Sequence, residues 1–291
     1  MSKDKLRIRF GPAGNSDIFY AQGFTATAQA PAWIKAMGLS TFEYSFGHGI
    51  RIRDATADTI REQAELNDIQ MSVHLPYYIN LAATEPEKQM KNREYFLKAV
   101  STGRKMGAVR GVFHPGSAGK ENRLVALSLA CNLLRDIMRD LDAEGFWDFT
   151  LCPETMGKLN QLGDLEEVLT LCGVDERLIP CIDFGHLHCR GHGALNTKED
   201  FEFILNATED RLGKQRASSM HIHFSRIEFS AGGEKMHRTF ADTQYGPEFQ
   251  PLAELLAERA YTPVVICESR GTMAEDAQTM QKMYEMVKGK G

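Results

Sequence analysis

The sequence predicts an α/β fold, a (β/α)8 TIM barrel that occupies residues 1–291 as a single domain. Three observations predict it. Short apolar runs alternate with helical patterns, the runs recur every 29 to 47 residues, and most of them end in histidine or carboxylate side chains. Each interval is long enough for a strand, a helix and two loops, and such a barrel needs about 250 residues. Two average domains would also fit this length, but no linker or charge run divides the chain.

Eight apolar runs are predicted as strands, each followed by a helix. The first two strands are Leu6–Phe10 and Thr41–Ser45. The next four end at His74, His114, Glu154 and Asp183, and the last two are Ser218–Phe224 and a run ending at Glu268. Runs of four to eight apolar residues between turn signals are typical of buried parallel strands.

The predicted helices are bounded by recognisable start and stop residues. Pro31 suits a first helical turn, because proline lacks an N–H group that would be unpaired there, and Gly107 suits a helix end. The eight helices are expected at Ala30–Met37, Thr56–Leu66, Glu87–Met106, Asn122–Glu144, Leu165–Leu171, Thr197–Asn206, Phe249–Arg259 and Ala274–Lys288. The segment between Phe224 and Phe249 is expected to be a long loop.

Composition narrows the class of protein. A hydrophobic fraction of 43% supports a packed core, and the six cysteines form no CxxC pair, so we expect reduced thiols. The apolar runs are shorter than the roughly 18 residues that a membrane span requires, and the first ten residues lack a signal-peptide core. We therefore expect a cytoplasmic monomer with no membrane partner. The net charge of −5 disfavours a general nucleic-acid coat protein but leaves room for a local basic face.

The predicted strand ends share one chemistry. In a barrel of this kind the carboxyl ends of the strands meet, and here they carry only imidazole and carboxylate groups. A single such residue is usually structural, but several in one cavity would repel each other without a cation. The set suits zinc or manganese. Its members are His74, His114, Glu154, Asp183, His221 and Glu268.

Four other histidines are less clearly placed by spacing. His186 follows Asp183 by three residues and can face the same cavity after a tight turn. His223 is two residues from His221, so one or both of them line the cavity. His188 and His192 lie in a glycine-rich segment and are expected to be solvated.

Seven short segments follow one another in this order along the chain: HLPYYINLA (74–82), FHPGS (113–117), PETMGK (153–158), CIDFGH (181–186), MHIH (220–223), KMHRTF (235–240) and CESRG (267–271). FHPGS and CIDFGH are the most specific of them. As an ordered set they resemble the endonuclease IV family, the zinc-dependent abasic-site endonucleases built on a TIM barrel of the xylose-isomerase-like superfamily.

The resemblance implies three metal ions, most simply Zn²⁺, although Mn²⁺ or Fe²⁺ suits the same ligands. His74, His114 and Glu154 would bind the first ion. Glu154, the expected catalytic carboxylate, would bridge to a second ion held also by Asp183, His221 and Glu268, with His223 as an additional candidate. His186 and His237 would bind the third.

The third site departs from the family pattern. The family places an aspartate two residues before the last histidine, where this chain has Lys235 with Glu234 one position earlier. Either Glu234 replaces the aspartate through a one-residue slip, or the third site is altered or empty and two ions remain.

The resemblance also implies contacts with damaged double-stranded DNA. Tyr77 and Tyr78 stand where the family inserts an aromatic and an apolar residue into the base stack, and Arg51 or Arg53 stands where it supplies an arginine. Three more basic residues are expected on strand-end loops, where each either meets phosphate or is simply solvated: Lys158, Arg190 and Arg238.

The leading hypothesis is therefore a hydrolase of DNA repair, a metal-dependent phosphodiesterase that cuts 5′ to abasic sites. The alternative is a metal-dependent sugar isomerase or epimerase on the xylose-isomerase-like barrel, which needs only two Glu, an Asp and a His. His74, His114, His186 and His237 separate the two, because a one-metal isomerase has no need of them. A non-catalytic damage-binding or metal-binding protein is the third hypothesis.

Overall fold

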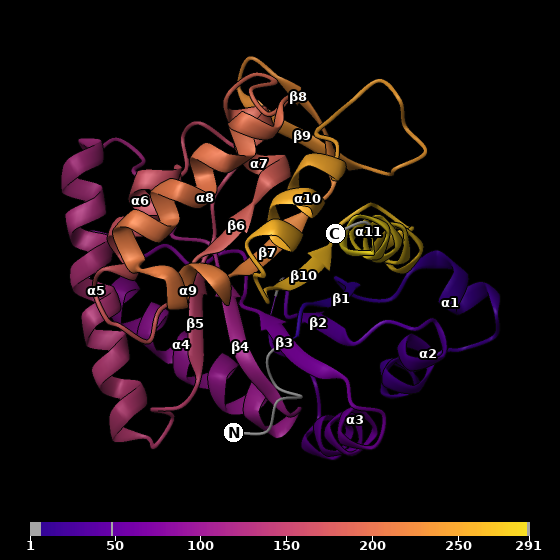
Figure 1. Cartoon of the computed structure of the whole chain (residues 1–291). Coiled ribbons are helices and arrows are strands. Elements are labelled where there is room, and N and C mark those ends of the chain that lie inside the picture. The colour runs from indigo at the N-terminus through magenta and orange to yellow at the C-terminus, as the bar shows by residue number, and fades with distance from the viewer. Residues whose placement is uncertain (1–6, 48, 290–291) are drawn as a thin grey trace.

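The computed structural model describes residues 7–47 and 49–289 of the chain, and a ring of parallel strands occupies its centre (Figure 1). One four-stranded sheet has the order β2-β3-β4-β5 and the other the order β1-β10-β7-β6. Single parallel bridges, Ala13 to Glu43 and Glu154 to Cys181, join the two sheets at both edges. The predicted α/β barrel is confirmed. Its strands are β1 (Arg9–Pro12), β2 (Thr41–Ser45), β3 (Gln70–His74), β4 (Ala108–Phe113), β5 (Thr150–Pro153), β6 (Cys181–Asp183), β7 (His221–Phe224) and β10 (Val264–Cys267).

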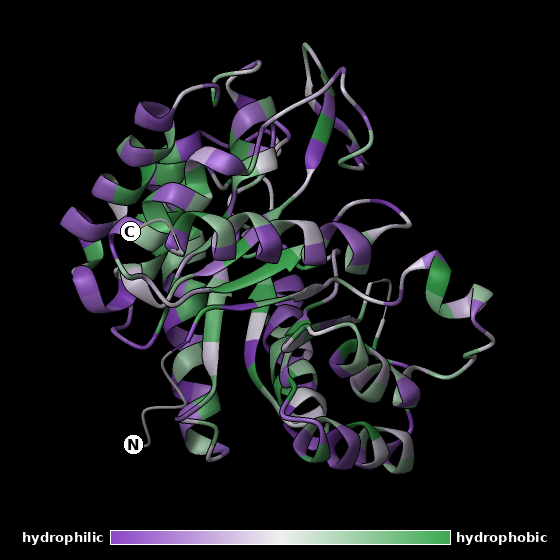
Figure 2. Cartoon of the chain, turned by 45° about the vertical axis from the view of Figure 1, so that its right-hand side comes forward, coloured by the Kyte–Doolittle hydropathy of each residue, from purple (hydrophilic) through white to green (hydrophobic). Residues whose placement is uncertain are grey.

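The helices form the outer layer, with polar residues outward and apolar residues toward the strands (Figure 2). All eight predicted helices are present, with bounds shifted by up to two residues at most ends; the helix expected at Thr197–Asn206 continues to Leu212. They are α2 (Ala30–Ala36), α3 (Asp54–Leu66), α4 (Pro86–Lys105), α5 (Arg123–Ala143), α6 (Leu165–Cys172), α8 (Lys198–Leu212), α10 (Gln250–Glu258) and α11 (Met273–Lys288). Shorter helical segments were not expected: α1 (Asp17–Ala21), η2 (Thr27–Gln29), α7 (Phe184–Arg190) and α9 (Lys214–Ser218).

Two predicted strands begin three residues later than expected. The first, predicted at Leu6–Phe10, is Arg9–Pro12, and Leu6 lies outside the described residues. The strand pairs with β10 through Pro12. At Gly11, β1 and β2 approach so closely that a Cβ would lie 1.8 Å from Thr41 O, which explains the glycine. The seventh, predicted to start at Ser218, starts at His221, because Ser218 ends helix α9.

The predicted loop after β7 is wrong, since it contains an antiparallel hairpin of β8 (Arg226–Ser230) and β9 (Gly233–Arg238). Apolar residues alternate along β8, and two glycines follow it, which is the pattern of a hairpin. Glu228 pairs with Met236 and Phe229 with Glu234, so Lys235 is the extra residue of a β-bulge. The hairpin stands at the rim of the barrel above α7 and β7 (Figure 1).

Within the described residues, no helix combines the length and the apolar character needed to cross a bilayer.

Candidate metal centre

The first group of ligand atoms comes from three neighbouring strand ends. His74 Nε2 and His114 Nε2 lie 3.0 and 3.2 Å from Glu154 Oε2, and Glu154 is almost completely buried. His74 Nδ1 is 2.8 Å from the carbonyl oxygen of Leu75, which can only accept a hydrogen bond, so Nδ1 carries the proton. His74 Nε2 is therefore the nitrogen that faces Glu154. This first group is His74, His114 and Glu154, and its ligand atoms lie within 4.8 Å of one another.

The second group shares Glu154 with the first and adds residues from the opposite sheet. His223 Nδ1 lies 3.2 Å from Glu154 Oε1 and 3.5 Å from Glu268 Oε1. The second group is Glu154, Asp183, His223 and Glu268, again within 4.8 Å.

His223, and not His221, occupies the position in the second group that the resemblance to the endonuclease IV family implied for His221. Register explains the exchange: β6 pairs Asp183 with His223 and Cys181 with His221, so His221 lies two residues deeper in the barrel. The MHIH segment offers two histidines on one face of the strand, and its sequence contains no information about which of them reaches the layer of Asp183.

The third group, His186, Glu234 and His237, joins helix α7 to the hairpin. Asp183 Oδ1 accepts a hydrogen bond of 2.8 Å from the backbone N–H of His186, which caps α7 and turns His186 toward the cavity. His186 Nδ1 is 2.8 Å from the carbonyl oxygen of Thr155, and its Nε2 lies 3.4 Å from Glu234 Oε2.

The bulge at Lys235 explains how Glu234 reaches the third group. In a regular strand residues three apart face opposite sides, but one extra residue lets Glu234 and His237 face the same side. Glu234 Oε1 lies 3.7 Å from His237 Nε2, and Lys235 points away to pair with Glu228. The geometry therefore favours the one-residue slip over an incomplete third site.

The three groups fit divalent cations. Asp183 Oδ2 and His186 Nε2 are buried and have no hydrogen-bond partner among the described residues. Burial alone would lower the pKa of His186, but Asp183, Glu154 and Glu234 raise it well above its usual value. The cavity thus holds excess negative charge that only a proton or a metal ion can balance. Imidazole and carboxylate donors at this spacing suit zinc, manganese or iron.

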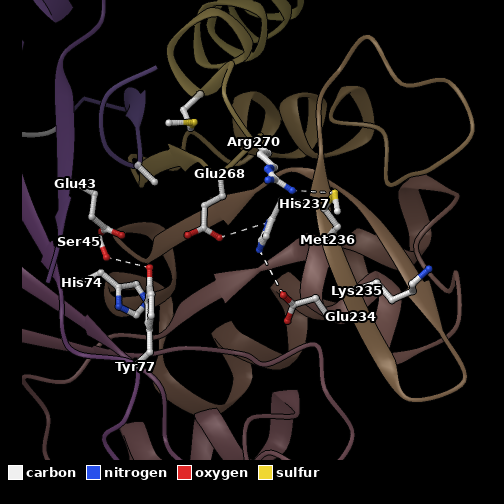
Figure 3. A pocket seen from close by; sticks show the side chains of 12 residues that line it. Glu43, Ser45, His74, Tyr77, Glu234, Lys235, Met236, His237, Glu268 and Arg270 are labelled. Carbon is white, nitrogen blue, oxygen red and sulfur yellow. Dashed lines mark hydrogen bonds and ion pairs between the residues drawn. The ribbon is translucent and has the colours of Figure 1, made fainter. Parts of the chain in front are cut away.

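A cavity of about 350 Å³ opens beside these groups (Figure 3). A second cavity of about 440 Å³ continues it toward β4 and β5, and Tyr77, Glu234, His237 and Glu268 line both. Basic side chains border them: Arg270 on the first and Lys158 on the second. The combined space is open to solvent and reaches all three groups.

The two tyrosines expected to insert into the base stack, as a wedge, have different surroundings. The ring of Tyr77 stacks on His114 with centroids 5.2 Å apart, and its hydroxyl lies 2.9 Å from Ser45 Oγ (Figure 3 shows the latter contact). Tyr78 instead packs against Tyr95 outside the two cavities. Both rings remain nearly half exposed. Tyr77 is therefore a wall of the metal centre as well as a candidate DNA contact.

The arginines considered as DNA contacts also differ in their partners. Arg190 donates to the backbone carbonyls of Met156, Lys158 and Gln161, and Arg238 pairs with Glu228, so both have structural partners. Arg51 and Arg53 are exposed on the segment between β2 and α3, and neither has an ion pair among the described residues.

Two histidines expected to be solvated have different surroundings. His188 is buried in α7, where its Nδ1 lies 3.1 Å from the carbonyl oxygen and 3.2 Å from the backbone nitrogen of Leu195, so that expectation is wrong for His188. His192 is exposed, as expected.

Sequence reasoning missed Glu43, which lies under the second group and contacts His221 and His223. A charged residue in the middle of the strand TFEYS was the available indication. Burial alone raises the pKa of Glu43, but His223 and His221 hold it well below its usual value.

The barrel with clustered ligands at its strand ends defines the class, and comparison with known proteins identifies the family. A model of the xylose isomerase-like TIM barrel matches residues 31–287, and the chain belongs to that family. An uncharacterized protein of Methanocaldococcus jannaschii is 33% identical over 86% of this chain and 89% of its own length. A probable endonuclease 4 of Mycoplasma pneumoniae is 31% identical over 58% of this chain and 57% of its own length. The chain is thus a divergent relative of endonuclease IV.

Solved structures support the fold and include both hypothesised activities. Endonuclease IV of Thermus thermophilus superposes with a TM-score of 0.66 at 19% identity, covering 91% of this chain and 95% of that one. D-psicose 3-epimerase of Clostridium cellulolyticum superposes with a TM-score of 0.63 at 13% identity, covering 91% and 94%. At these identities the likeness shows the barrel alone.

Proposed function

We propose that this protein is a metal-dependent phosphodiesterase that cuts duplex DNA 5′ to abasic sites. One observation carries the proposal: three ligand groups surround one open cavity, and Glu154 belongs to two of them. Divalent ions held there would supply Lewis-acid polarisation of a phosphoryl oxygen and activation of water near neutral pH. A reaction of this kind requires no side-chain nucleophile.

Residues of the chain would orient the ligand groups and contact the substrate. Glu154 Oε2 lies 3.0 and 3.2 Å from the Nε2 atoms of His74 and His114, so the three side chains of the first group converge on one point. Lys158 and Arg270 border the cavities, where they can meet phosphate oxygens. The exposed ring of Tyr77 can pack against the sugar or base that borders the lesion.

The test is incision of a duplex oligonucleotide that carries one abasic-site analogue, by zinc-loaded protein, with elemental analysis of the same sample. Incision 5′ to the analogue with about three ions per chain would support the proposal. An undamaged duplex of the same sequence is the control, and equal cutting of both would refute the lesion preference.

One observation favours a sugar isomerase or epimerase instead. The second group alone supplies two Glu, an Asp and a His to a single ion. Loss of the first group separates the two candidates: His114→Ala should remove nuclease activity, whereas an isomerase that uses only the second group should retain turnover of ketoses. No incision by the parent protein, with one or two ions bound, would favour the isomerase.

A further inference from the structure

The layer beneath the second group contains the buried carboxylate of Glu43. Ser72 Oγ donates to Glu43 Oε2 over 2.8 Å, and His221 Nε2 lies 3.1 Å from the same oxygen. The other oxygen, Oε1, lies 3.0 Å from His223 Nε2. Glu43 is 1% exposed. An ionised carboxylate inside a barrel is costly unless its neighbours compensate it, so this position calls for a physical cause.

The other histidines of the centre indicate why a carboxylate is buried at this position. His74 and His186 each place Nδ1 against a backbone carbonyl, which fixes a proton on that nitrogen and leaves Nε2 as the nitrogen that faces the ligand groups. A metal-binding histidine generally needs such an acceptor for its remote N–H. In His223 the ring is reversed, because Nδ1 faces Glu154 and Glu268 while Nε2 faces Glu43.

We propose that Glu43 is a positioning residue that takes the N–H of His223 Nε2 and so presents Nδ1 to a divalent cation in the second group. Glu43 Oε1 and His223 Nε2 are buried 3.0 Å apart, and neither has a hydrogen-bond partner among the described residues, so a turn of the ring is needed to align them. The other oxygen, Oε2, accepts a hydrogen bond from Ser72, which limits the movement of the carboxylate. The proposal rests on the metal centre of the proposed function but not on its substrate.

A competing explanation is a further ion in this layer. Cys181, His221 and His223 also have ligand atoms within 4.8 Å of one another, and all three are buried. The carboxylate of Glu43 accounts for the two imidazoles without an ion, because each lies within hydrogen-bonding distance of one of its oxygens. Metal counting decides between the two explanations.

The first experiment measures zinc affinity of the full chain by competition with a chelator. Glu43→Gln keeps the shape and one acceptor, whereas Glu43→Leu removes both acceptors. We expect affinity at one site to fall about 10-fold for Gln and toward 100-fold for Leu, the range typical of lost outer-sphere partners. Glu167→Gln is the matched control, since it neutralises a buried carboxylate that is bonded to Arg123 and belongs to none of the candidate metal groups, and its zinc affinity should equal that of the parent.

The second experiment is long-range ¹H–¹⁵N NMR of the zinc-loaded parent, which identifies the protonated nitrogen of each histidine. His223 should carry its proton on Nε2, and His74 and His186 on Nδ1. This readout needs no variant, so it holds even if Glu43→Leu does not fold.

Each outcome bears on a stated claim. Zinc affinity within threefold of the parent in both Glu43 variants, or a proton on His223 Nδ1, overturns the positioning role. An additional equivalent of zinc that is lost in Cys181→Ser also overturns it, in favour of the further ion. A parent that binds zinc as expected but does not cut abasic DNA refutes the proposed nuclease and leaves the role of Glu43 standing, whereas a parent that binds no zinc refutes both.

Discussion

The barrel strands and the β8–β9 hairpin supply ligand atoms to one cavity in different ways. Strand ends place His74, Asp183 and Glu268 by topology, because parallel strands of a barrel all end on the same face. The hairpin places Glu234 and His237 through one bulged residue, Lys235. Topology tolerates small changes of length in the outer helices, whereas the hairpin ligands depend on a local register. The barrel ligands should therefore be the robust part of the centre and the hairpin ligands the adjustable part.

The sharpest test of the barrel part is Glu154→Gln. Removing the charge shared by the first and second groups should lower incision by about a thousandfold or more, which corresponds to the several kcal/mol that a metal-ion centre supplies. Bound zinc should fall by more than one equivalent in elemental analysis. Near-normal turnover would show that no bridging carboxylate is required.

Deletion of Lys235 tests the hairpin part. Without Lys235, Glu234 and His237 would be two residues apart in a regular strand and would still face the same side of β9, so metal content should be retained and incision should change by less than about 10-fold. Lys235→Ala is the control, because it keeps the bulge and removes only the pair with Glu228. If the deletion variant lost one equivalent of metal, this account of the bulge would be wrong.

Tyr77 at the cavity wall and Tyr78 outside the cavities test the predicted contact with DNA. Replacing both with Ala should weaken binding to abasic duplex about 10-fold, since stacking on an aromatic ring contributes about 1–3 kcal/mol per base. Metal content should change less, although Tyr77 stacks on His114. The measurement is fluorescence anisotropy with Tyr78→Ala alone as the matched variant; equal affinities of parent and double variant would exclude the wedge role.

Glu167 is a buried carboxylate that belongs to none of the candidate metal groups, and it serves as the comparison with the ligand carboxylates. Burial by itself raises the pKa of Glu167, but hydrogen bonds from Arg123 and from the backbone N–H groups of Gly163 and Asp164 lower it below 4.5. A carboxyl with a lowered folded pKa stabilises the protein above its unfolded pKa, and this contribution is lost as pH falls through the folded value. Glu167→Gln should cost about 1–3 kcal/mol at pH 7 and flatten the acid limb of the stability curve below about pH 4.5.

Denaturant unfolding at several pH values measures this difference. A parent and a variant whose stabilities differ equally at pH 7 and pH 3 would contradict the assigned pKa. Unchanged zinc content in the variant would confirm that Glu167 and the ligand groups act separately.

The fold and the strand-end ligands were predictable because period, spacing and chemistry agree along the chain. The strand ends at His74 and Asp183 follow from apolar runs that stop at a charged or imidazole side chain. The choice between His221 and His223 was not predictable, because it depends on the register of β6 with β7. Glu43 was missed because its partners come from strands distant in sequence. The hairpin was missed because a long loop after a barrel strand is common.

The barrel has two seams, the junctions where its two sheets meet, and they have a mechanical consequence. Each of the two four-stranded sheets is continuous, but they meet through the single bridges at Ala13–Glu43 and Glu154–Cys181. The second group takes Glu154 from one sheet and Asp183, His223 and Glu268 from the other. An ion bound there would link the two sheets directly. Chelation should accordingly speed hydrogen exchange along both seams before it affects the interior of either sheet.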